Sequence, residues 1–211
     1  MYTCIIFDID GTMINTEKAM IESMRQALYE VTGSSYSYND LLPFMGIPGD
    51  TALQQLGIEN IAAVNKRWSD YLGQYANDIH LYPGIDVVVK TLHDMGIATG
   101  VVTSKTRREL KDEFAPFGLM PYLPISVCAD DTLLHKPNPE PMLEFLELSA
   151  IDKSRCIYIG DTIYDHMCAS SAGVDFALAT WGASAPDRID AKFKLKDPSD
   201  ILQLVQGVLS Q

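Results

Sequence analysis

Cys4-Ile5-Ile6-Phe7-Asp8-Ile9-Asp10-Gly11-Thr12 is the stretch that decides the fold of this chain. Its first four residues form an apolar run with the length and composition of a buried strand. Two carboxylates follow two residues apart, and such positions on a strand face the same side, so Asp8 and Asp10 are expected to converge where the strand ends. Two anions held together share a proton or bind a cation, which indicates a metal site, a nucleophile or an acid/base group. An ordinary strand that ends in an Asp-Gly turn is the alternative interpretation.

Apolar runs of strand length recur along the chain and predict five buried strands: Thr3–Phe7, Ile97–Thr103, Pro124–Ala129, Cys156–Ile159 and Phe176–Ala179. Helical patterns separate or follow them, at Ile85–Met95, Arg107–Phe117, Pro139–Leu148, Tyr164–Ala172 and Ser199–Val208. Strands that alternate with helices are typical of a parallel sheet. The sequence therefore predicts an α/β fold with a Rossmann-like core.

The segment after the first strand breaks this alternation. It shows helical patterns at Thr16–Val31, Tyr38–Leu42, Asp50–Leu56 and Ile61–Tyr75 and no clear strand. We therefore expect a small all-helical cap at residues 15–80, inserted after the first strand of a core that comprises residues 1–14 and 81–211. A helical layer belonging to a single domain is the alternative.

Composition narrows the classes of partner. The 211 residues are 47% hydrophobic and 21% charged, with a net charge of −12 and no basic run, which argues against nucleic acid or an anionic membrane. No apolar stretch approaches the roughly 20 residues of a membrane span. The first residues show no basic segment that leads into an apolar one with a cleavage site, so we do not expect secretion. The four cysteines form no CxxC pair and are expected to be reduced. We expect a cytoplasmic protein that is a monomer or a homodimer.

Polar residues follow each of the first four predicted strands, in the order Asp8 and Asp10, Thr103 and Ser104, Lys136, then Asp161 with Asp165. In open parallel sheets, ligands bind at the carboxyl ends of the strands. Each piece alone has an ordinary interpretation as a helix cap, a solvated lysine or first-turn acids. Their joint occurrence at four successive strand ends favours a functional site.

The charges of this set favour a metal ion. Four carboxylates at one edge repel one another, and Lys136 supplies a single positive charge. Oxygen ligands without His or Cys at ligand spacing suit a hard cation such as Mg²⁺, which keeps positions open for water and phosphate oxygens.

The motifs Asp8-x-Asp10-Gly11-Thr12, Thr103, Lys136 and Gly160-Asp161-x-x-x-Asp165 together resemble those of the haloacid dehalogenase superfamily of phosphotransferases. The helical insert resembles the cap of that superfamily. The resemblance implies that Asp8 is the nucleophile that carries the phosphoryl group and that Asp10 is the general acid/base. It also implies that the substrate is a small phosphorylated metabolite and that Thr103, Ser104 and Lys136 contact it. Mg²⁺ would be held by Asp8, the Asp10 backbone carbonyl and Asp161, with Asp165 as a ligand or behind the ligands.

Local matches narrow the resemblance to the phosphoglycolate phosphatase group. They are Asn15-Thr16-Glu17, Leu81-Tyr82-Pro83-Gly84, Val102-Thr103-Ser104-Lys105, Lys136-Pro137-Asn138-Pro139-Glu140-Pro141 and Thr180-Trp181-Gly182. The related pyrophosphatase-like members are similar too, including around Leu41–Gly46. Because no Arg or Lys occurs between Arg25 and Lys66, the cap offers few cations for a second anionic group. Phosphoglycolate, pyrophosphate and a broad range of small phosphates remain open as substrates.

Two further alternatives belong to other classes. A mutase similar to β-phosphoglucomutase shares the motifs and the cap, but the cap shows no cluster of polar residues for a sugar. A signalling receiver domain also carries an aspartyl phosphate, but such domains are shorter and lack the insert.

Overall fold

The computed structural model describes residues 1–207 of the chain. Two compact units are present, one built from residues 1–14 and the chain from residue 81 onward, the other from residues 15–80. No helix within the described range is both long and apolar enough to cross a bilayer.

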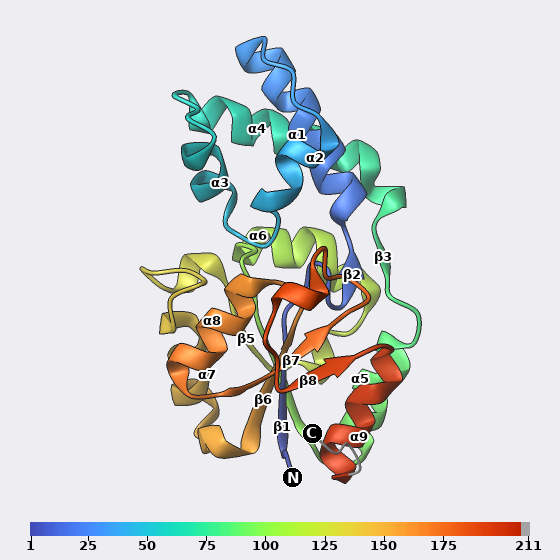
Figure 1. Ribbon diagram of the computed structural model, residues 1–211. Coiled ribbons are helices and arrows are strands. Elements are labelled where there is room, and N and C mark those ends of the chain that lie inside the picture. Colours follow the sequence, from blue (N-terminus) through green and yellow to red (C-terminus); the bar gives the residue numbers. More distant parts are fainter. Residues whose placement is uncertain (208–211) are drawn as a thin grey trace. The chain divides into compact units, whose positions relative to one another are not determined.

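The larger unit holds a sheet of six parallel strands in the order β5-β4-β1-β6-β7-β8 (Figure 1). Their bounds are β1 (Cys4–Phe7), β4 (Ala98–Val102), β5 (Ile125–Val127), β6 (Cys156–Gly160), β7 (Asp175–Ala179) and β8 (Phe193–Leu195). From β1 the chain builds outward through β4 and β5, then returns to the other side of β1 for β6, β7 and β8. Ligands of open α/β sheets bind where the strand order reverses in this way, at the carboxyl ends of the strands.

The predicted parallel α/β fold is confirmed, and each of the five predicted strands is present within a few residues. The sixth strand, β8, was missed. It is three residues long, lies at the sheet edge, and contains an exposed lysine, Lys194, next to the buried Leu195. Short, charged edge strands avoid pairing with other chains, but they leave no apolar run in the sequence.

Helices cover both faces of this sheet. α7 (Glu140–Ser149) and α8 (Ile163–Ala172) pack on one face, whereas α5 (Ile85–Asp94), with α9 (Ile201–Gln206) beside it, covers the other (Figure 1). Short helical turns complete the unit: α6 (Arg107–Glu109), η3 (Leu110–Phe114), η4 (Ala115–Phe117), η5 (Met120–Tyr122), η6 (Ala129–Asp131), η7 (Lys153–Arg155), η8 (Pro186–Arg188) and η9 (Pro198–Asp200).

Two predicted helices are less regular than expected. The segment 107–117 starts as α6, widens into the π-helical turn η3 and tightens into η4, because Pro116 lacks an N–H and Gly118 adopts a left-handed conformation. The last predicted helix, Ser199–Val208, contains α9, which ends at Gln206, and Val208 lies outside the described residues.

Strand alternation determines where the first carboxylate points. Cys4 and Ile6 of β1 belong to the apolar core that also contains Phe145 of α7 and Cys168 of α8. Asp8 comes two residues after Ile6, and its N–H continues the ladder to Ile159 O at 2.9 Å. Asp8 therefore faces the α7–α8 side of the sheet.

All four cysteines are buried and free, as expected from the sequence.

The smaller unit is helical: α1 (Glu17–Thr32), α2 (Tyr38–Leu41), η1 (Leu42–Phe44), α3 (Gly49–Gln55), α4 (Ile61–Leu72) and η2 (Gly73–Asp78). α1 and α4 form its main pair, and α4 buries Val64, Trp68 and Leu72 at the four-residue spacing of an amphipathic helix. Where the chain leaves and re-enters the larger unit, the two-residue strands β2 (Ile14–Asn15) and β3 (His80–Leu81) pair with each other. These two strands were not predicted.

Candidate active site at the carboxyl edge of the sheet

Lys136 is the centre of a buried ionic cluster. Its Nζ lies 2.9 Å from Asp8 Oδ1 and 2.7 Å from Asp165 Oδ1, and its side chain is 1% exposed. The lysine precedes α7, Asp8 follows β1 and Asp165 lies in the first turn of α8. The three predicted site residues thus meet on the face of the sheet that α7 and α8 cover.

Asp165 is fixed by the start of its own helix. Thr162 is the N-cap of α8, and its hydroxyl donates to Asp165 Oδ2 at 2.6 Å and accepts from the Asp165 N–H at 3.3 Å. The Thr162 N–H also donates to Oδ2 at 3.0 Å. This capping box holds one carboxylate oxygen and leaves the other for Lys136.

Tyr158 supports the cluster from within the sheet. Its hydroxyl lies 2.7 Å from Val102 O and 3.0 Å from Asp165 Oδ1, so it can donate to either, and it accepts from Lys136 Nζ at 3.2 Å. Burial, together with the nearby Asp165 and Asp8 carboxylates, raises the pKa of the Tyr158 phenol well above its usual value. Tyr158 therefore stays a neutral donor.

Asp161 is held by the turn that follows β1. The Thr12 hydroxyl donates to Asp161 Oδ1 at 3.1 Å. Gly11, between Asp10 and Thr12, has φ +74°, and a Cβ at this position would collide with the Asp161 carboxylate. Glycine is therefore required here both for the left-handed backbone and for the close approach of Asp161.

Asp10 lies in a second ionic group. Lys105 Nζ is 3.0 Å from Asp10 Oδ1 and also contacts Glu113 Oε2. Both lysines are buried, with side chains 4% exposed at Lys105 and 1% at Lys136. The two predicted carboxylates of the first motif thus pair with different cations.

Thr103 and Ser104 follow β4, the strand beside β1. The register pairs Phe7 with Val101, so Thr103 comes one residue beyond the level of Asp8. The Thr103 hydroxyl accepts the Lys105 N–H at 3.2 Å. The contacts of Thr103 and Ser104 with a substrate remain predictions.

The electrostatics of the first cluster leave negative charge in excess. Asp8, Asp161 and Asp165 offer carboxylate oxygens within 4.8 Å of one another, and Lys136 pairs with two of these residues. Burial, opposed by Lys136 and reinforced by the Asp165 and Asp10 carboxylates, raises the pKa of Asp8 to about 7. Burial, followed by the Asp165 and Asp8 carboxylates, also raises the pKa of Asp161 well above its usual value.

These residues fit a divalent cation. The donor set consists of oxygens, it is largely buried, and its raised carboxyl pKa values mean that ionisation is penalised until a further positive charge arrives. The Asp165 oxygens already accept hydrogen bonds from Lys136, Tyr158 and Thr162, which suits a role behind the ligands. Asp8 and Asp161 are the better candidates for direct contact with Mg²⁺.

Trp181 stabilises the turn that carries Asp10, Gly11 and Thr12. Its indole Nε1–H donates to Thr12 O at 3.0 Å, and its ring meets Tyr82 edge-on at 6.4 Å. A Cβ on the next residue, Gly182, would collide with the Gly11 carbonyl. The loop after β7 therefore packs directly against the turn that carries Asp10.

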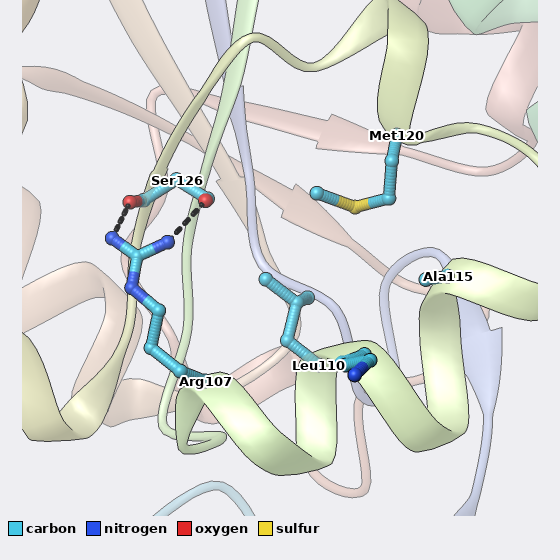
Figure 2. A pocket seen from close by; sticks show the side chains of 6 residues that line it. Arg107, Leu110, Ala115, Met120 and Ser126 are labelled. Carbon is cyan, nitrogen blue, oxygen red and sulfur yellow. Dashed lines mark hydrogen bonds between the residues drawn. The ribbon is translucent and has the colours of Figure 1, made fainter.

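A pocket of about 230 Å³ lies elsewhere in this unit (Figure 2). It is lined by Arg107, Leu110, Lys111, Ala115, Met120 and Ser126. Arg107 donates from its guanidinium to the hydroxyl and the carbonyl of Ser126, at 3.0 and 2.8 Å. The pocket contains none of the predicted site residues.

Sequence reasoning missed several members of the site. Tyr158 could have been noticed because a phenol in an otherwise apolar strand needs a buried partner. Thr12, Lys105 and Trp181 lie within the sequence motifs, but no role was predicted for them. Glu113 shows no local signal, because its contact with Lys105 depends on how the segment 107–117 folds.

Asp161→Asn is expected to raise the thermal midpoint of the metal-free protein by about 2–4 °C at pH 8, and to remove the stabilisation by Mg²⁺. A carboxyl whose pKa is raised by folding contributes stability that is present at low pH and lost as the pH rises through the raised pKa, and asparagine avoids that loss. Thermal unfolding of both proteins at pH 6 and pH 8, with and without Mg²⁺, measures this. In the native protein the rise caused by Mg²⁺ should be larger at pH 8, since protons compete less. If Mg²⁺ raised the thermal midpoint of both proteins equally, Asp161 would not be a metal ligand.

The chain matches the family described as haloacid dehalogenase-like hydrolase over residues 5–179. A protein of Caldanaerobacter subterraneus subsp. tengcongensis, provisionally named pyrophosphatase PpaX, is 30% identical over 210 residues, which cover 97% of this chain and 95% of that protein. The pyrophosphatase PpaX of Halalkalibacterium halodurans is 27% identical over 205 residues, which cover 95% of each. A crystal structure from Lactobacillus plantarum, provisionally named phosphoglycolate phosphatase, has a TM-score of 0.89 at 30% identity and covers 97% of this chain and 99% of that one.

Proposed function

Because the chain belongs to the haloacid dehalogenase-like hydrolase family, we propose that it is a Mg²⁺-dependent phosphatase that hydrolyses small phosphate monoesters through an aspartyl phosphate on Asp8. The resemblance predicted from the motifs is confirmed at the level of this family. The observation that carries the proposal is the buried Lys136, placed between the Asp8 and Asp165 carboxylates.

In the first half of the reaction, an Asp8 carboxylate oxygen attacks phosphorus and the bond from phosphorus to the leaving oxygen breaks. Lys136 donates to Asp8 Oδ1 and keeps that carboxylate oriented while negative charge gathers on the transferring group. Asp10 gives its proton to the leaving oxygen. Mg²⁺ held by Asp8, Asp161 and the Asp10 carbonyl would neutralise phosphoryl oxygens.

In the second half, water attacks the phosphorus of the aspartyl phosphate. Asp10 takes the proton of that water, the bond between phosphorus and Asp8 breaks, and the Asp8 carboxylate is restored with release of inorganic phosphate. A group that gives a proton in one step and takes one in the next must keep its place throughout the cycle.

Phosphoglycolate is our first candidate substrate, supported by the local motif matches and by the name of the Lactobacillus plantarum protein. In the smaller unit, Lys18 pairs with Asp78, Arg25 with Glu22, and Arg67 with Glu30 and Asp70. The smaller unit contains four Lys and Arg residues, the fourth being Lys66, so three of the four already have acidic partners. This pairing favours a small substrate over one with a second anionic group. Pyrophosphate is the second candidate, supported by the names of the two PpaX relatives.

Phosphate release from phosphoglycolate, pyrophosphate, sugar phosphates and nucleotides, ranked by kcat/KM in the presence of Mg²⁺, tests this proposal. We expect the small substrates to rank above sugar phosphates and nucleotides by at least about tenfold, in line with the discrimination that a binding pocket provides. Equal turnover of all classes would indicate a broad phosphatase. Isomerisation of a sugar phosphate without phosphate release would establish a mutase and contradict the proposal.

A further inference from the structure

We propose that Lys105, anchored by Glu113, is a positioning residue that holds the Asp10 carboxylate in place for proton exchange with the leaving group and with water. The inference rests on the proposed function, because Asp10 needs a fixed place only if it transfers protons. It adds two residues to the machinery that the motifs identify.

The ammonium group of Lys105 lies between two carboxylates. Its Nζ is 3.0 Å from Asp10 Oδ1 and also contacts Glu113 Oε2, and the lysine side chain is 4% exposed. The Asp10 side chain is 24% exposed, so its carboxylate remains accessible to water and to a substrate. Charge-assisted hydrogen bonds of this kind are short and directional, and they restrict the rotation of the carboxylate.

The backbone of Lys105 is held on both sides. Its N–H donates to Thr103 Oγ1 at 3.2 Å, and its carbonyl accepts from the Ala129 N–H at 2.9 Å. These contacts tie the lysine to the ends of β4 and β5. Lys105 is therefore part of the rigid edge of the sheet rather than of a free loop.

The backbone segment that carries Glu113 is fixed independently of Lys105. It lies in η3, whose Leu110 and Phe114 are buried in the core. The start of the same segment is attached to β5, where the Arg107 guanidinium binds the hydroxyl and the carbonyl of Ser126 (Figure 2). Asp10, Lys105 and Glu113 thus form a chain of contacts that leads from the site to a rigid part of the fold.

Two buried lysines divide the acidic residues between them. Lys136 pairs with Asp8 and Asp165, whereas Lys105 pairs with Asp10 and Glu113. The two ionic groups share no residue, so each lysine orients its own pair of carboxylates. The Lys105 contact therefore keeps Asp10 directed at the place where protons are exchanged.

The consequence is a dependence on the leaving group. An alkyl phosphate such as phosphoglycolate expels a strongly basic alkoxide and needs the proton of Asp10. p-Nitrophenyl phosphate expels an acidic phenol and needs little help. A carboxylate misplaced by about an ångström loses roughly a hundredfold in rate, so the loss should appear only where the proton is needed.

Lys105→Met, compared with Lys111→Met, provides the test. Lys111 is an exposed lysine of the same segment and lies outside the ionic group, so its variant should match the native enzyme. For Lys105→Met, kcat/KM for phosphoglycolate should fall by about 30–100-fold, and kcat/KM for p-nitrophenyl phosphate by less than about threefold. The kcat for p-nitrophenyl phosphate should still fall, because hydrolysis of the phosphoenzyme also uses Asp10. If phosphoglycolate is not a substrate, glycerol phosphate serves as the alkyl ester.

An equal fall of kcat/KM for both esters would indicate a merely structural lysine, and unchanged values would remove the role altogether. Should Lys105→Met not fold, Glu113→Gln keeps Lys105 and is expected to show the same selective pattern at about three- to tenfold. Failure of the proposed function would be seen in a different variant. If the proposed function were wrong, Asp8→Asn would still hydrolyse both esters.

Discussion

Asp8→Asn is expected to lower kcat by about 10⁴-fold or more while the protein remains folded. Asparagine has nearly the shape of aspartate, and its amide oxygen can still accept from Lys136 Nζ, which lies 2.9 Å from Asp8 Oδ1 in the native protein. An amide is not a nucleophile towards phosphorus, so the first half of the reaction is lost. Phosphate release measures the activity, and circular dichroism with a thermal scan measures the fold.

Asp175→Asn is the matched control. Asp175 begins β7, at the amino end of the sheet, and pairs with Lys192 on the surface. The same chemical change at this position should leave kcat within about twofold, as surface substitutions usually do. If the Asp8 variant kept more than a few per cent of native turnover, Asp8 would not be the nucleophile.

Lys136→Met is expected to destabilise the protein by about 3–5 kcal/mol and to lower kcat by at least about 10³-fold. Removal of the ammonium group leaves the Asp8 and Asp165 carboxylates buried without their shared cation, and burial already raises the pKa of Asp8 to about 7 with that cation present. Urea unfolding in the absence of divalent cations measures the stability. Lys90→Met, which removes an exposed lysine of α5, should cost under about 0.5 kcal/mol.

A second substitution separates stability from catalysis. Adding Asp165→Asn to Lys136→Met removes one of the two carboxylates left unpaired, so part of the lost stability should return while activity stays lost. A cost below about 1 kcal/mol for Lys136→Met, or turnover near the native rate, would contradict the placement of Lys136 at the centre of the site.

Much of the fold was predictable because it depends on local patterns. The run Cys4–Phe7 has apolar residues on both faces, which only a central strand of a covered sheet requires. Once that strand is central and parallel, strand alternation directs Asp8 to one face, and the carboxyl ends of β4 and β6 bring Thr103 and Asp161 to the same edge. By contrast, β8 has one buried residue of three and could not be distinguished from a loop.

The pairing inside the site could not be predicted. Lys136 and Lys105 are both lysines near strand ends, and nothing local indicates which carboxylate each one meets. The division follows from three-dimensional packing: the α8 capping box directs Asp165 to Lys136, and the π-turn η3 brings Glu113 to Lys105. Sequence patterns identify the residues that reach the edge, and only the fold determines their partners.

The central claim is that the phosphoryl group passes through Asp8, and trapping that intermediate tests it most directly. In the Asp10→Asn variant, p-nitrophenyl phosphate should still phosphorylate the enzyme, because its leaving group needs no proton, but hydrolysis should stall. After rapid acid quench and peptide mass spectrometry, we expect close to one phosphoryl group per chain on the peptide that contains Asp8. Release of p-nitrophenol with no covalent phosphate, or phosphate on another peptide, would contradict the account.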